Sequence, residues 1–182
     1  MDHVSVGGRD LRVLYSKDVI AARVAEIAND IAAAKMERLM VVPILKGSFI
    51  FAADLVRALH EVGLAPTVEF LSLSSYREAK VSSGQVEILR DVEGEVEGRS
   101  VLLVDDILES GRTTAFAKDL MVARGAIAVK TCVLLDKPGK RAADITADFV
   151  GFECPDYFVV GYGMDMAHDY RQLPFVGVVE ES

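Results

Sequence analysis

The sequence has few cysteines, no long apolar run and no basic cluster, and each absence excludes a class of protein. Its two cysteines, Cys132 and Cys154, are far apart and match no metal or redox spacing, so a reducing cytoplasm is the expected setting. No apolar run approaches the length of a membrane span, and residues 1–12 (MDHVSVGGRDLR) lack the apolar core of a signal peptide. We therefore expect a cytoplasmic protein with no membrane partner.

Positive charge is scarce as well. The chain has 20 Lys and Arg against 28 Asp and Glu, a formal net charge of −8. Proteins that bind nucleic acid or anionic lipid without sequence preference need a positive surface to meet the phosphates, so this balance argues against both partners. The motifs GxGxxG and GxxxxGK[ST], which mark dinucleotide-binding and P-loop proteins, are also absent.

Residues 1–182 are expected to form one domain, because 51% of them are hydrophobic and no linker, repeat or low-complexity tract interrupts them. Strand-like apolar segments alternate with helical patterns, which favours an α/β fold with a central, mostly parallel twisted sheet flanked by helices. Strands are expected at 40–45, 67–73, 101–104, 128–135, 148–152, 157–160 and 175–179. Three helices are expected. One follows the N-cap residue Ser16, one follows Ser48 and ends at about His60, and one runs from about Thr113 to Gly125.

Two polar stretches separate the strands expected at 67–73 and 101–104. Residues 76–83 (YREAKVSS) are weakly periodic, and residues 91–98 (DVEGEVEG) carry acids and glycines. Both features are typical of loops, so we expect a long, mobile, hairpin-like excursion here.

The most informative segment is 101–114, VLLVDDILESGRTT. An apolar run typical of a buried strand ends in two adjacent carboxylates, Asp105 and Asp106, and a third acid, Glu109, follows after two apolar residues. A helical pattern then opens with small or hydroxyl-bearing residues at Ser110, Gly111, Thr113 and Thr114. Polar groups at the carboxyl end of a parallel strand, followed by a helix start, are where α/β sheets bind anionic ligands.

This turn supplies what a terminal phosphate needs. Gly111 lets the backbone approach the phosphate oxygens, the amides at the helix start are free donors, and the neighbouring hydroxyls add further donors. Two aspartates beside a phosphate are explained if they accept hydrogen bonds from sugar hydroxyls, or approach a metal-bound sugar diol. The segment therefore predicts a ribose 5-phosphate site, although an isolated acid pair in such a loop is more often a solvated surface feature.

The full order of residues in 101–114 resembles the phosphoribosyl-pyrophosphate signature of the type I phosphoribosyltransferases. The resemblance implies the type I phosphoribosyltransferase fold, with a small hood formed by the terminal segments and a flexible lid loop at about 74–90. It also implies that phosphoribosyl pyrophosphate binds to Asp105, Asp106, Ser110, Gly111, Arg112, Thr113 and Thr114.

Three further stretches resemble the 6-oxopurine branch of this family, which acts on hypoxanthine, guanine or xanthine. In the first, residues 45–48, the resemblance implies that Lys46 and Gly47 contact pyrophosphate and that a cis peptide bond precedes the lysine, although nothing in the sequence itself shows one. In the second, it implies that Ser75 and Tyr76 belong to a lid that closes over the reacting sugar. Taken alone, a serine and a tyrosine at a strand end are more often turn residues.

The third stretch runs from Asp136 and Lys137 to residue 174. By resemblance, Lys137 would donate to the purine 6-oxo group, Phe158 would stack on the base, and the Val159 backbone would read the purine edge. Arg171 would contact pyrophosphate. Without the resemblance, Phe158 would be assigned to the core, and Phe152 is the aromatic residue most easily confused with it.

Magnesium is the one cofactor that the resemblance implies. Asp165 would bind it beside the base, and Asp105 and Asp106 are further candidate ligands. The metal would neutralise the pyrophosphate leaving group, while Glu109 would take or stabilise the proton that purine N7 loses as N9 attacks the sugar.

The signature departs from the family pattern in the length of its acids. The first acid is usually glutamate and is Asp105 here, whereas the third is usually aspartate and is Glu109 here. A longer carboxylate at the expected proton acceptor must fold back or shift the purine. Arg112 stands where lysine is common in the family. His168 also departs from the family pattern, and it either tunes proton chemistry or is a surface histidine.

The expected activity is formation of IMP or GMP from hypoxanthine or guanine by a homodimer or homotetramer, with no nucleic acid as partner. A phosphoribosyltransferase for another base is one alternative, and Lys137 with the aromatic strand after it argues against a non-purine base. The other alternative is a regulator that senses phosphoribosyl pyrophosphate without catalysis. Lys46, Asp165 and Arg171 favour catalysis instead.

Overall fold

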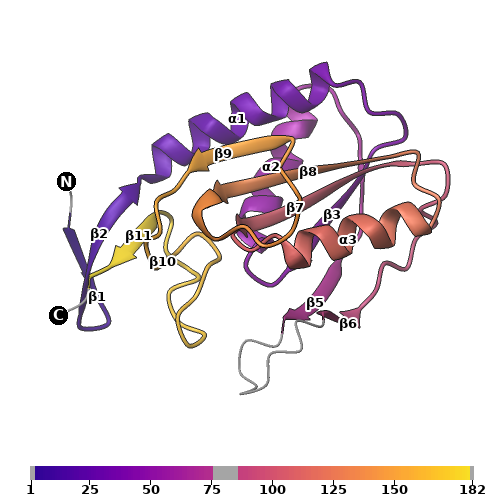
Figure 1. The fold of residues 1–182 in the computed structure, drawn as a ribbon. Helices are drawn as coiled ribbons and strands as arrows, with labels where there is room; N and C mark the ends of the chain where they lie inside the picture. Colours follow the sequence, from indigo (N-terminus) through magenta and orange to yellow (C-terminus); the bar gives the residue numbers. More distant parts are fainter. Residues whose placement is uncertain (1–2, 76–85, 181–182) are drawn as a thin grey trace.

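The computed structural model, which describes residues 3–75 and 86–180, places a large sheet between two layers of helices and a small sheet at one end (Figure 1). The strands of the large sheet are β3 (Met40–Leu45), β4 (Thr67–Val68), β5 (Leu71–Ser75), β6 (Val86–Arg90), β7 (Ser100–Leu108), β8 (Ala128–Asp136) and β9 (Phe149–Glu153). Their order is β6-β5-β3-β7-β8-β9, with β4 paired to β3. All pairs are parallel except β5 with β6, which confirms the mostly parallel sheet predicted from the sequence.

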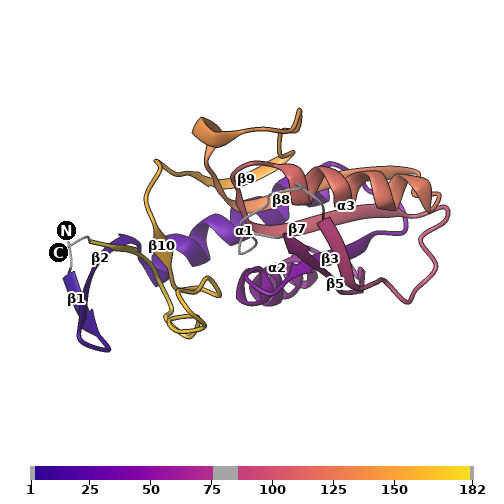
Figure 2. The same ribbon diagram turned by 60° about the horizontal axis from the view of Figure 1, so that its bottom comes forward.

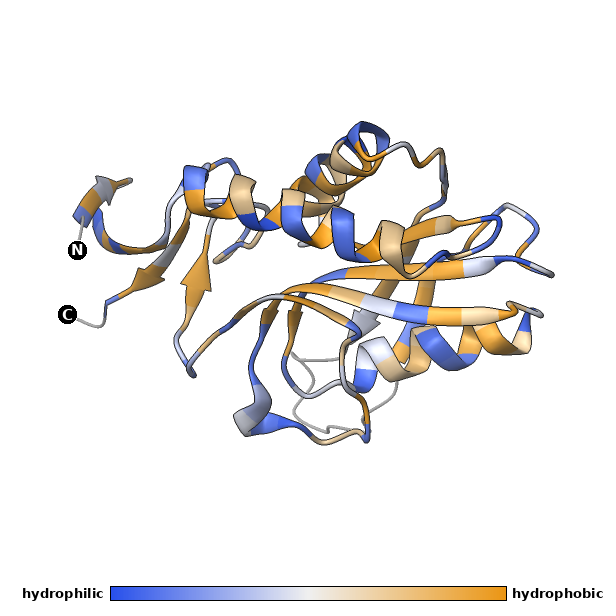
Figure 3. Cartoon of the chain, turned by 90° about the horizontal axis from the view of Figure 1, so that it is seen from above, coloured by the Kyte–Doolittle hydropathy of each residue, from blue (hydrophilic) through white to orange (hydrophobic). Residues whose placement is uncertain are grey.

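Helices cover both faces of this sheet (Figure 3). Helices α1 (Lys17–Ala33) and α2 (Phe49–Glu61) lie on one face and α3 (Arg112–Ala123) on the other, and a short 3-10 helix, η1 (Pro138–Lys140), follows β8. Ser16 caps α1 as predicted, since its Oγ accepts a hydrogen bond from the Val19 amide at 3.4 Å. Helix α3 is followed by Gly125, whose φ of +85° suits the predicted helix end.

The apolar run 101–104 is buried on both faces of β7. Val101 and Leu103 pack against α3, whereas Leu102 and Val104 pack beneath α1 and α2. A strand covered on both sides needs a continuous apolar run rather than an alternating one. This central strand carries Asp105 and Asp106 at its carboxyl end, and Glu109 follows its last residue.

The small sheet is the predicted hood. It has the order β1-β2-β11-β10, and its strands are β1 (His3–Val6), β2 (Arg9–Tyr15), β10 (Val159–Val160) and β11 (Val176–Val179). Figure 2 shows that both ends of the chain lie at this sheet. The β1–β2 hairpin is absent from the sequence prediction; Gly7 and Gly8, both at positive φ, form its turn, and Leu11 is its one fully buried apolar residue.

Three predicted segments differ from the structure. The strand expected at 67–73 is two strands, β4 and β5, and only Val159 and Val160 of the strand expected at 157–160 are extended partners of β11. The prediction that 91–98 belongs to a mobile excursion is wrong, because Val92 and Val96 are buried in the core on the α3 side of the sheet.

The predicted lid at 74–90 is described only at its ends. Residues 74 and 75 belong to β5 and residues 86–90 form β6, and the two strands pair antiparallel as in a hairpin. Ser75 is the last residue of β5, and Tyr76 lies outside the described residues. Among the residues that are described, no helix is long and apolar enough to cross a bilayer.

Candidate active site

A cavity of about 310 Å³ lies where the carboxyl ends of β3, β7 and β8 meet the hood. Parallel strands place their carboxyl ends at one edge, which is where open α/β sheets bind ligands. Most of the predicted site residues line this cavity, namely Lys46, Gly47, Asp105, Asp106, Glu109, Ser110, Gly111, Thr113, Thr114, Lys137, Phe158, Val159 and Asp165. The structure thus brings together residues from three separate stretches of the sequence.

The rest of the lining is apolar and was not predicted. It consists of Ile44, Leu45, Leu73, Ile107 and Met164. These residues belong to strands or to the turn before Asp165, and their apolar character made them indistinguishable from core residues in the sequence.

Of the residues predicted to bind phosphoribosyl pyrophosphate, Arg112 and Arg171 do not line the cavity. Arg112 is exposed on the first turn of α3, and its backbone amide donates to the Ser110 Oγ at 3.4 Å. The guanidinium of Arg171 donates to the Gly163 carbonyl at 2.7 Å and lies 3.0 Å from the Asp165 Oδ1. Arg171 is therefore tied to a residue of the cavity wall rather than exposed in the cavity itself.

The turn before α3 has the shape predicted for a phosphate loop. Gly111 is the N-cap residue of α3 with φ at +79°, and a Cβ there would lie 2.6 Å from the Ile145 Cγ2. Only glycine fits this conformation and this space. The Ser110 carbonyl accepts hydrogen bonds from the amides of Ala142 and Ala143 at 2.8 and 3.0 Å, and these bonds fix the turn to the segment after η1. The first amides of α3 are thereby presented at the cavity.

The two signature aspartates lie in different environments. Asp105 is buried, and its carboxylate accepts hydrogen bonds from the Thr114 hydroxyl at 3.4 Å and from the Asp106 amide at 3.0 Å. Burial, and then the adjacent Asp106 carboxylate, raise the pKa of Asp105 well above its usual range. Asp106 is only partly buried and accepts a hydrogen bond from the Ile107 amide at 2.9 Å. Asp106 is accordingly the more accessible acceptor for a sugar hydroxyl.

The loop after β3 is closely packed beside these acids. The peptide bond between Leu45 and Lys46 is cis, as the family resemblance implied. A Cβ on Gly47 would lie 1.9 Å from the Asp106 Oδ2, and a Cβ on Gly163 would lie 2.4 Å from the Gly47 carbonyl oxygen. Glycine is required at Gly163, where φ is +99° and the neighbour is backbone, whereas a side chain on Gly47 would displace the loop or the Asp106 carboxylate.

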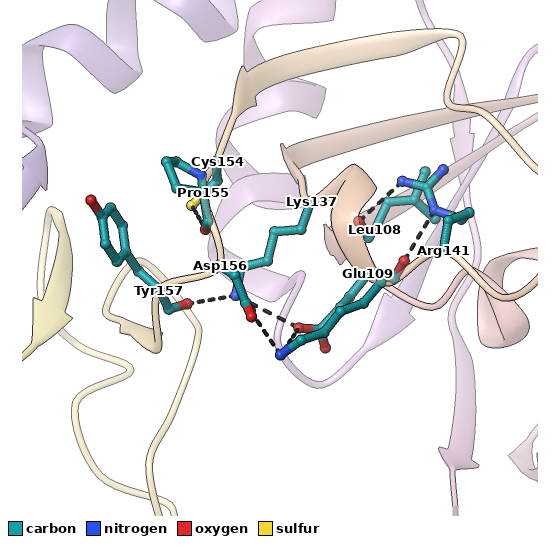
Figure 4. Close-up of polar contacts among 9 residues, drawn as sticks. Leu108, Glu109, Lys137, Arg141, Cys154, Pro155, Asp156 and Tyr157 are labelled. Carbon is teal, nitrogen blue, oxygen red and sulfur yellow. Dashed lines mark hydrogen bonds and ion pairs between the residues drawn. The ribbon is translucent and has the colours of Figure 1, made fainter.

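Glu109 faces two ammonium groups (Figure 4). Its Oε1 lies 3.8 Å from the Nζ of Lys137 and 4.0 Å from the Nζ of Lys140. Lys137 is buried, and its Nζ also donates to the Tyr157 carbonyl at 2.6 Å. Lys140 lies 2.8 Å from the Asp156 Oδ1, and this hydrogen bond lowers the pKa of Asp156. The carboxylate of Glu109 is thus held in a positive environment on the same side of the cavity as Lys137.

The two candidate aromatic residues have separate roles. Phe152 stacks on Tyr15, with ring centroids 4.0 Å apart and an angle of 16° between the planes. Phe158 is 57% exposed and lines the cavity. An aromatic ring on a cavity wall, with one side open, is available to stack on a flat ligand, whereas Phe152 is occupied in the packing of the hood against β9.

The cavity offers oxygen ligands for a hard cation. Among the described residues, no group of three or more His, Cys, Asp and Glu side chains is arranged to hold a metal ion. The carboxylates of Asp106 and Asp165 nevertheless line the cavity, and Mg²⁺ is commonly held by one or two carboxylates together with water and substrate phosphates. The residues present therefore fit a magnesium ion that binds with its substrate. His168 lies next to this site but its side chain is 88% exposed, in agreement with a surface histidine.

Known proteins share both the sequence and the fold. Residues 14–167 match the family model described as the phosphoribosyl transferase domain. The chain belongs to the phosphoribosyltransferase family. It is 44% identical to the hypoxanthine-guanine phosphoribosyltransferase of Aquifex aeolicus over 178 residues, which are 97% of this chain and 98% of that protein. The protein of the same name from Bacillus subtilis is 41% identical over 170 residues, covering 93% of each chain.

A solved structure has the same architecture. The hypoxanthine-guanine phosphoribosyltransferase of Bacillus anthracis, with a HEPES molecule in its active site, superposes with a TM-score of 0.86 at 41% identity, covering 93% of this chain and 98% of that one. These similarities confirm the predicted fold and the predicted 6-oxopurine branch of the phosphoribosyltransferases.

The cavity of this phosphoribosyltransferase has two chemically distinct ends. At one end, the turn before α3 offers backbone amides and hydroxyls. At the other end, Lys137 and Phe158 combine a buried cation with an exposed aromatic ring, and the Glu109 carboxylate lies 3.8 Å from the Lys137 Nζ. A ligand that carries a phosphate at one end and a flat heterocycle at the other matches this arrangement.

Proposed function

We propose that the chain transfers the 5-phosphoribosyl group from phosphoribosyl pyrophosphate to N9 of hypoxanthine or guanine, giving IMP or GMP and pyrophosphate. The observation that carries this proposal is that Lys137 and Phe158 line the same cavity as the phosphate turn before α3. Full-length similarity to hypoxanthine-guanine phosphoribosyltransferases supports it independently. From the similarity to these enzymes we also propose that the chain forms a homodimer or homotetramer in the cytoplasm.

The sugar-phosphate half of the substrate is held by the signature segment. The 5-phosphate accepts hydrogen bonds from the first amides of α3, that of Thr114 included, and from the hydroxyls of Ser110 and Thr113, whereas the Thr114 hydroxyl donates to Asp105. The ribose hydroxyls donate to Asp106, while Asp105 supports the site from its buried position. Because these groups are fixed by the sheet and by the closely packed turn, the sugar is held in one orientation for attack.

The base half is read by hydrogen bonding and stacking. The Lys137 ammonium donates to the purine 6-oxo group, which an amino group at the same position cannot accept in the same way. Phe158 stacks on the purine and the Val159 backbone reads its edge. Glu109 takes the proton from N7 as N9 attacks the sugar, and its carboxylate faces the ammonium groups of Lys137 and Lys140.

Asp165 and the signature aspartates would hold a magnesium ion together with the substrate, and the ion would supply positive charge opposite the leaving pyrophosphate. Lys46 and the Gly47 backbone contact the same pyrophosphate from the loop after β3. Arg171 acts on this end of the cavity by orienting the Asp165 carboxylate, to which it is paired at 3.0 Å.

Steady-state kinetics with several bases test this proposal. The purified chain is incubated with phosphoribosyl pyrophosphate, magnesium and, in turn, hypoxanthine, guanine, xanthine and adenine, and pyrophosphate release and nucleotide formation are measured. We expect turnover with hypoxanthine or guanine, none with adenine, and loss of turnover when a chelator removes magnesium. Absence of pyrophosphate release with every 6-oxopurine, while phosphoribosyl pyrophosphate still binds, would instead identify a sensor without catalysis.

A further inference from the structure

Arg141 donates hydrogen bonds to the backbone on which the proposed proton acceptor stands. Its Nε donates to the Glu109 carbonyl at 3.0 Å, and its Nη2 donates to the Leu108 carbonyl at 3.4 Å (Figure 4). Leu108 is the last residue of β7, so Glu109 stands where the strand ladder ends and no longer fixes the chain. The guanidinium takes over that function for the Glu109 carbonyl and adds a second donor to the Leu108 carbonyl.

The same guanidinium also contacts the element that carries Lys137. Its Nη2 forms an ion pair with Asp136, the last residue of β8, and the Lys137 amide donates to the Leu108 carbonyl at 2.9 Å. One side chain therefore links the ends of two neighbouring strands. These two ends carry the proton acceptor and the group proposed to read the 6-oxo position.

Arg141 contacts the phosphate turn as well. The Cβ that Gly111 lacks would lie 3.0 Å from the Arg141 Cδ, so the aliphatic stem packs directly behind the N-cap of α3. Its Nη1 donates to the Ile145 carbonyl at 2.6 Å, which holds the 141–145 segment against that turn. The side chain is 18% exposed, so these contacts are largely shielded from water.

We propose that Arg141 is a positioning residue that sets the place of Glu109 relative to Lys137 and supports the phosphate turn behind Gly111. This role rests on the proposed transferase function. Arg141 is not among the residues that line the cavity, so we assign it no direct contact with substrate. Its planar guanidinium has five donors in a fixed fork, which a lysine ammonium at the end of a flexible chain cannot imitate.

The chain contains a matched control in Arg23. The Arg23 guanidinium also donates to two successive carbonyls, those of Val150 and Gly151, at 2.8 and 2.9 Å, and also pairs with a carboxylate, Glu26, at 2.6 Å. Its side chain is 31% exposed, and neither it nor its partners line the cavity. R23K removes the same kind of contact as R141K, but from the helix α1 and strand β9 interface.

The test compares R141K, R23K and the wild type in kcat, in the KM values and in the dissociation constant of phosphoribosyl pyrophosphate measured by calorimetry. We expect kcat of R141K to fall by about tenfold to a hundredfold, because small displacements of a catalytic group cost rate on this scale. The dissociation constant should rise severalfold, and R23K should change neither value, although both variants lower Tm. Unchanged kcat and affinity in R141K would overturn the proposal.

A double variant separates positioning from general destabilisation. In an E109Q background, R141K should cause little further loss of the residual turnover, because its effect on rate acts through Glu109. A loss by the same factor in both backgrounds would mean that Arg141 merely stabilises the fold, and would overturn the positioning role. D136N, which keeps the side-chain size and removes one partner of the guanidinium, gives a milder second variant and should shift kcat in the same direction.

The two proposals fail in different ways. If the wild type shows no turnover with any purine, the proposed function fails, whereas calorimetry still tests Arg141. In that case a weaker affinity for phosphoribosyl pyrophosphate in R141K than in R23K supports the link to the phosphate turn, and equal affinities overturn it.

Discussion

The carboxylate of Glu109 and the ammonium of Lys137 lie 3.8 Å apart, although 27 residues that include all of α3 separate them in the sequence. On a 6-oxopurine, N7 and the 6-oxo oxygen are neighbours along one edge of the base. A carboxylate and an ammonium at this separation are placed to meet both atoms of that edge together. Recognition of the base and removal of its proton are therefore expected to depend on a single pair of side chains.

Replacement of Glu109 by glutamine tests its role as proton acceptor. The amide keeps the size of the side chain but cannot accept the N7 proton, so we expect kcat to fall by about 10²- to 10⁴-fold. The dissociation constant of phosphoribosyl pyrophosphate should stay near the wild-type value. E93Q, which changes an exposed glutamate paired with Arg90, serves as control and should leave turnover unchanged. Normal turnover in E109Q would assign proton removal to another group.

Replacement of Lys137 by methionine tests base recognition. The change keeps a long side chain but removes the donor to the 6-oxo group, so the KM for hypoxanthine should rise by about tenfold to a hundredfold, the range for loss of a hydrogen bond to a charged group. The KM for phosphoribosyl pyrophosphate should remain within about twofold, since hydroxyls and amides elsewhere hold the phosphate. K130M, at a lysine 3.6 Å from Asp148 on the far part of β8, is the matched control. Equal KM values for hypoxanthine in K137M and the wild type would contradict this role.

Two phenylalanine variants separate stacking from packing. F158A removes a 57% exposed ring, so Tm should hardly change while the KM for the purine rises by about tenfold or more, as expected for loss of base stacking. F152A removes the ring that stacks on Tyr15 and should lower Tm, with a smaller effect on the KM for the purine. The pair is measured by thermal unfolding and steady-state kinetics, and a reversed pattern would return Phe158 to a structural role.

Much of the fold follows from local patterns, but the hood does not. The run 101–104 predicts a buried strand because both of its faces are covered, and Ser16 predicts a helix start because its side chain caps a free amide. The β1–β2 hairpin has mostly exposed residues and one fully buried residue, Leu11, so its pattern carries almost no signal. That hairpin is fixed by pairing with β11, a contact between opposite ends of the chain.

The candidate site was predictable where one segment holds several functional groups, and less so elsewhere. The signature 101–114 places its acids and its turn at adjacent points of one strand and one helix. Arg141 carries no such signal, since its importance arises only from carbonyls more than thirty residues away in the sequence. Arg171 illustrates the opposite case, in which a motif position points to the correct region but the side chain is held by Asp165 outside the cavity.

Replacement of Gly47 by alanine tests the close packing of the loop after β3. The added Cβ would lie 1.9 Å from the Asp106 Oδ2, so either the loop or Asp106 must move. We expect the affinity for phosphoribosyl pyrophosphate to fall by about tenfold or more, because misplacement of this order strongly affects a preorganised site. G139A is the control, since no atom lies within 4 Å of a Cβ at that position. Wild-type affinity in G47A would show that the loop adapts without loss.

The hood also determines when the purine side of the cavity is complete during synthesis. The Phe158 carbonyl accepts a hydrogen bond from the Val179 amide at 3.0 Å, and β10 pairs with β11 and through it with β2. The ring proposed to stack on the base is thus anchored by a residue that is synthesised after it, whereas the turn before α3 is built from residues that precede both. A nascent chain therefore holds the signature residues of its proposed sugar-phosphate site before its proposed base site has the strand β11 that supports it.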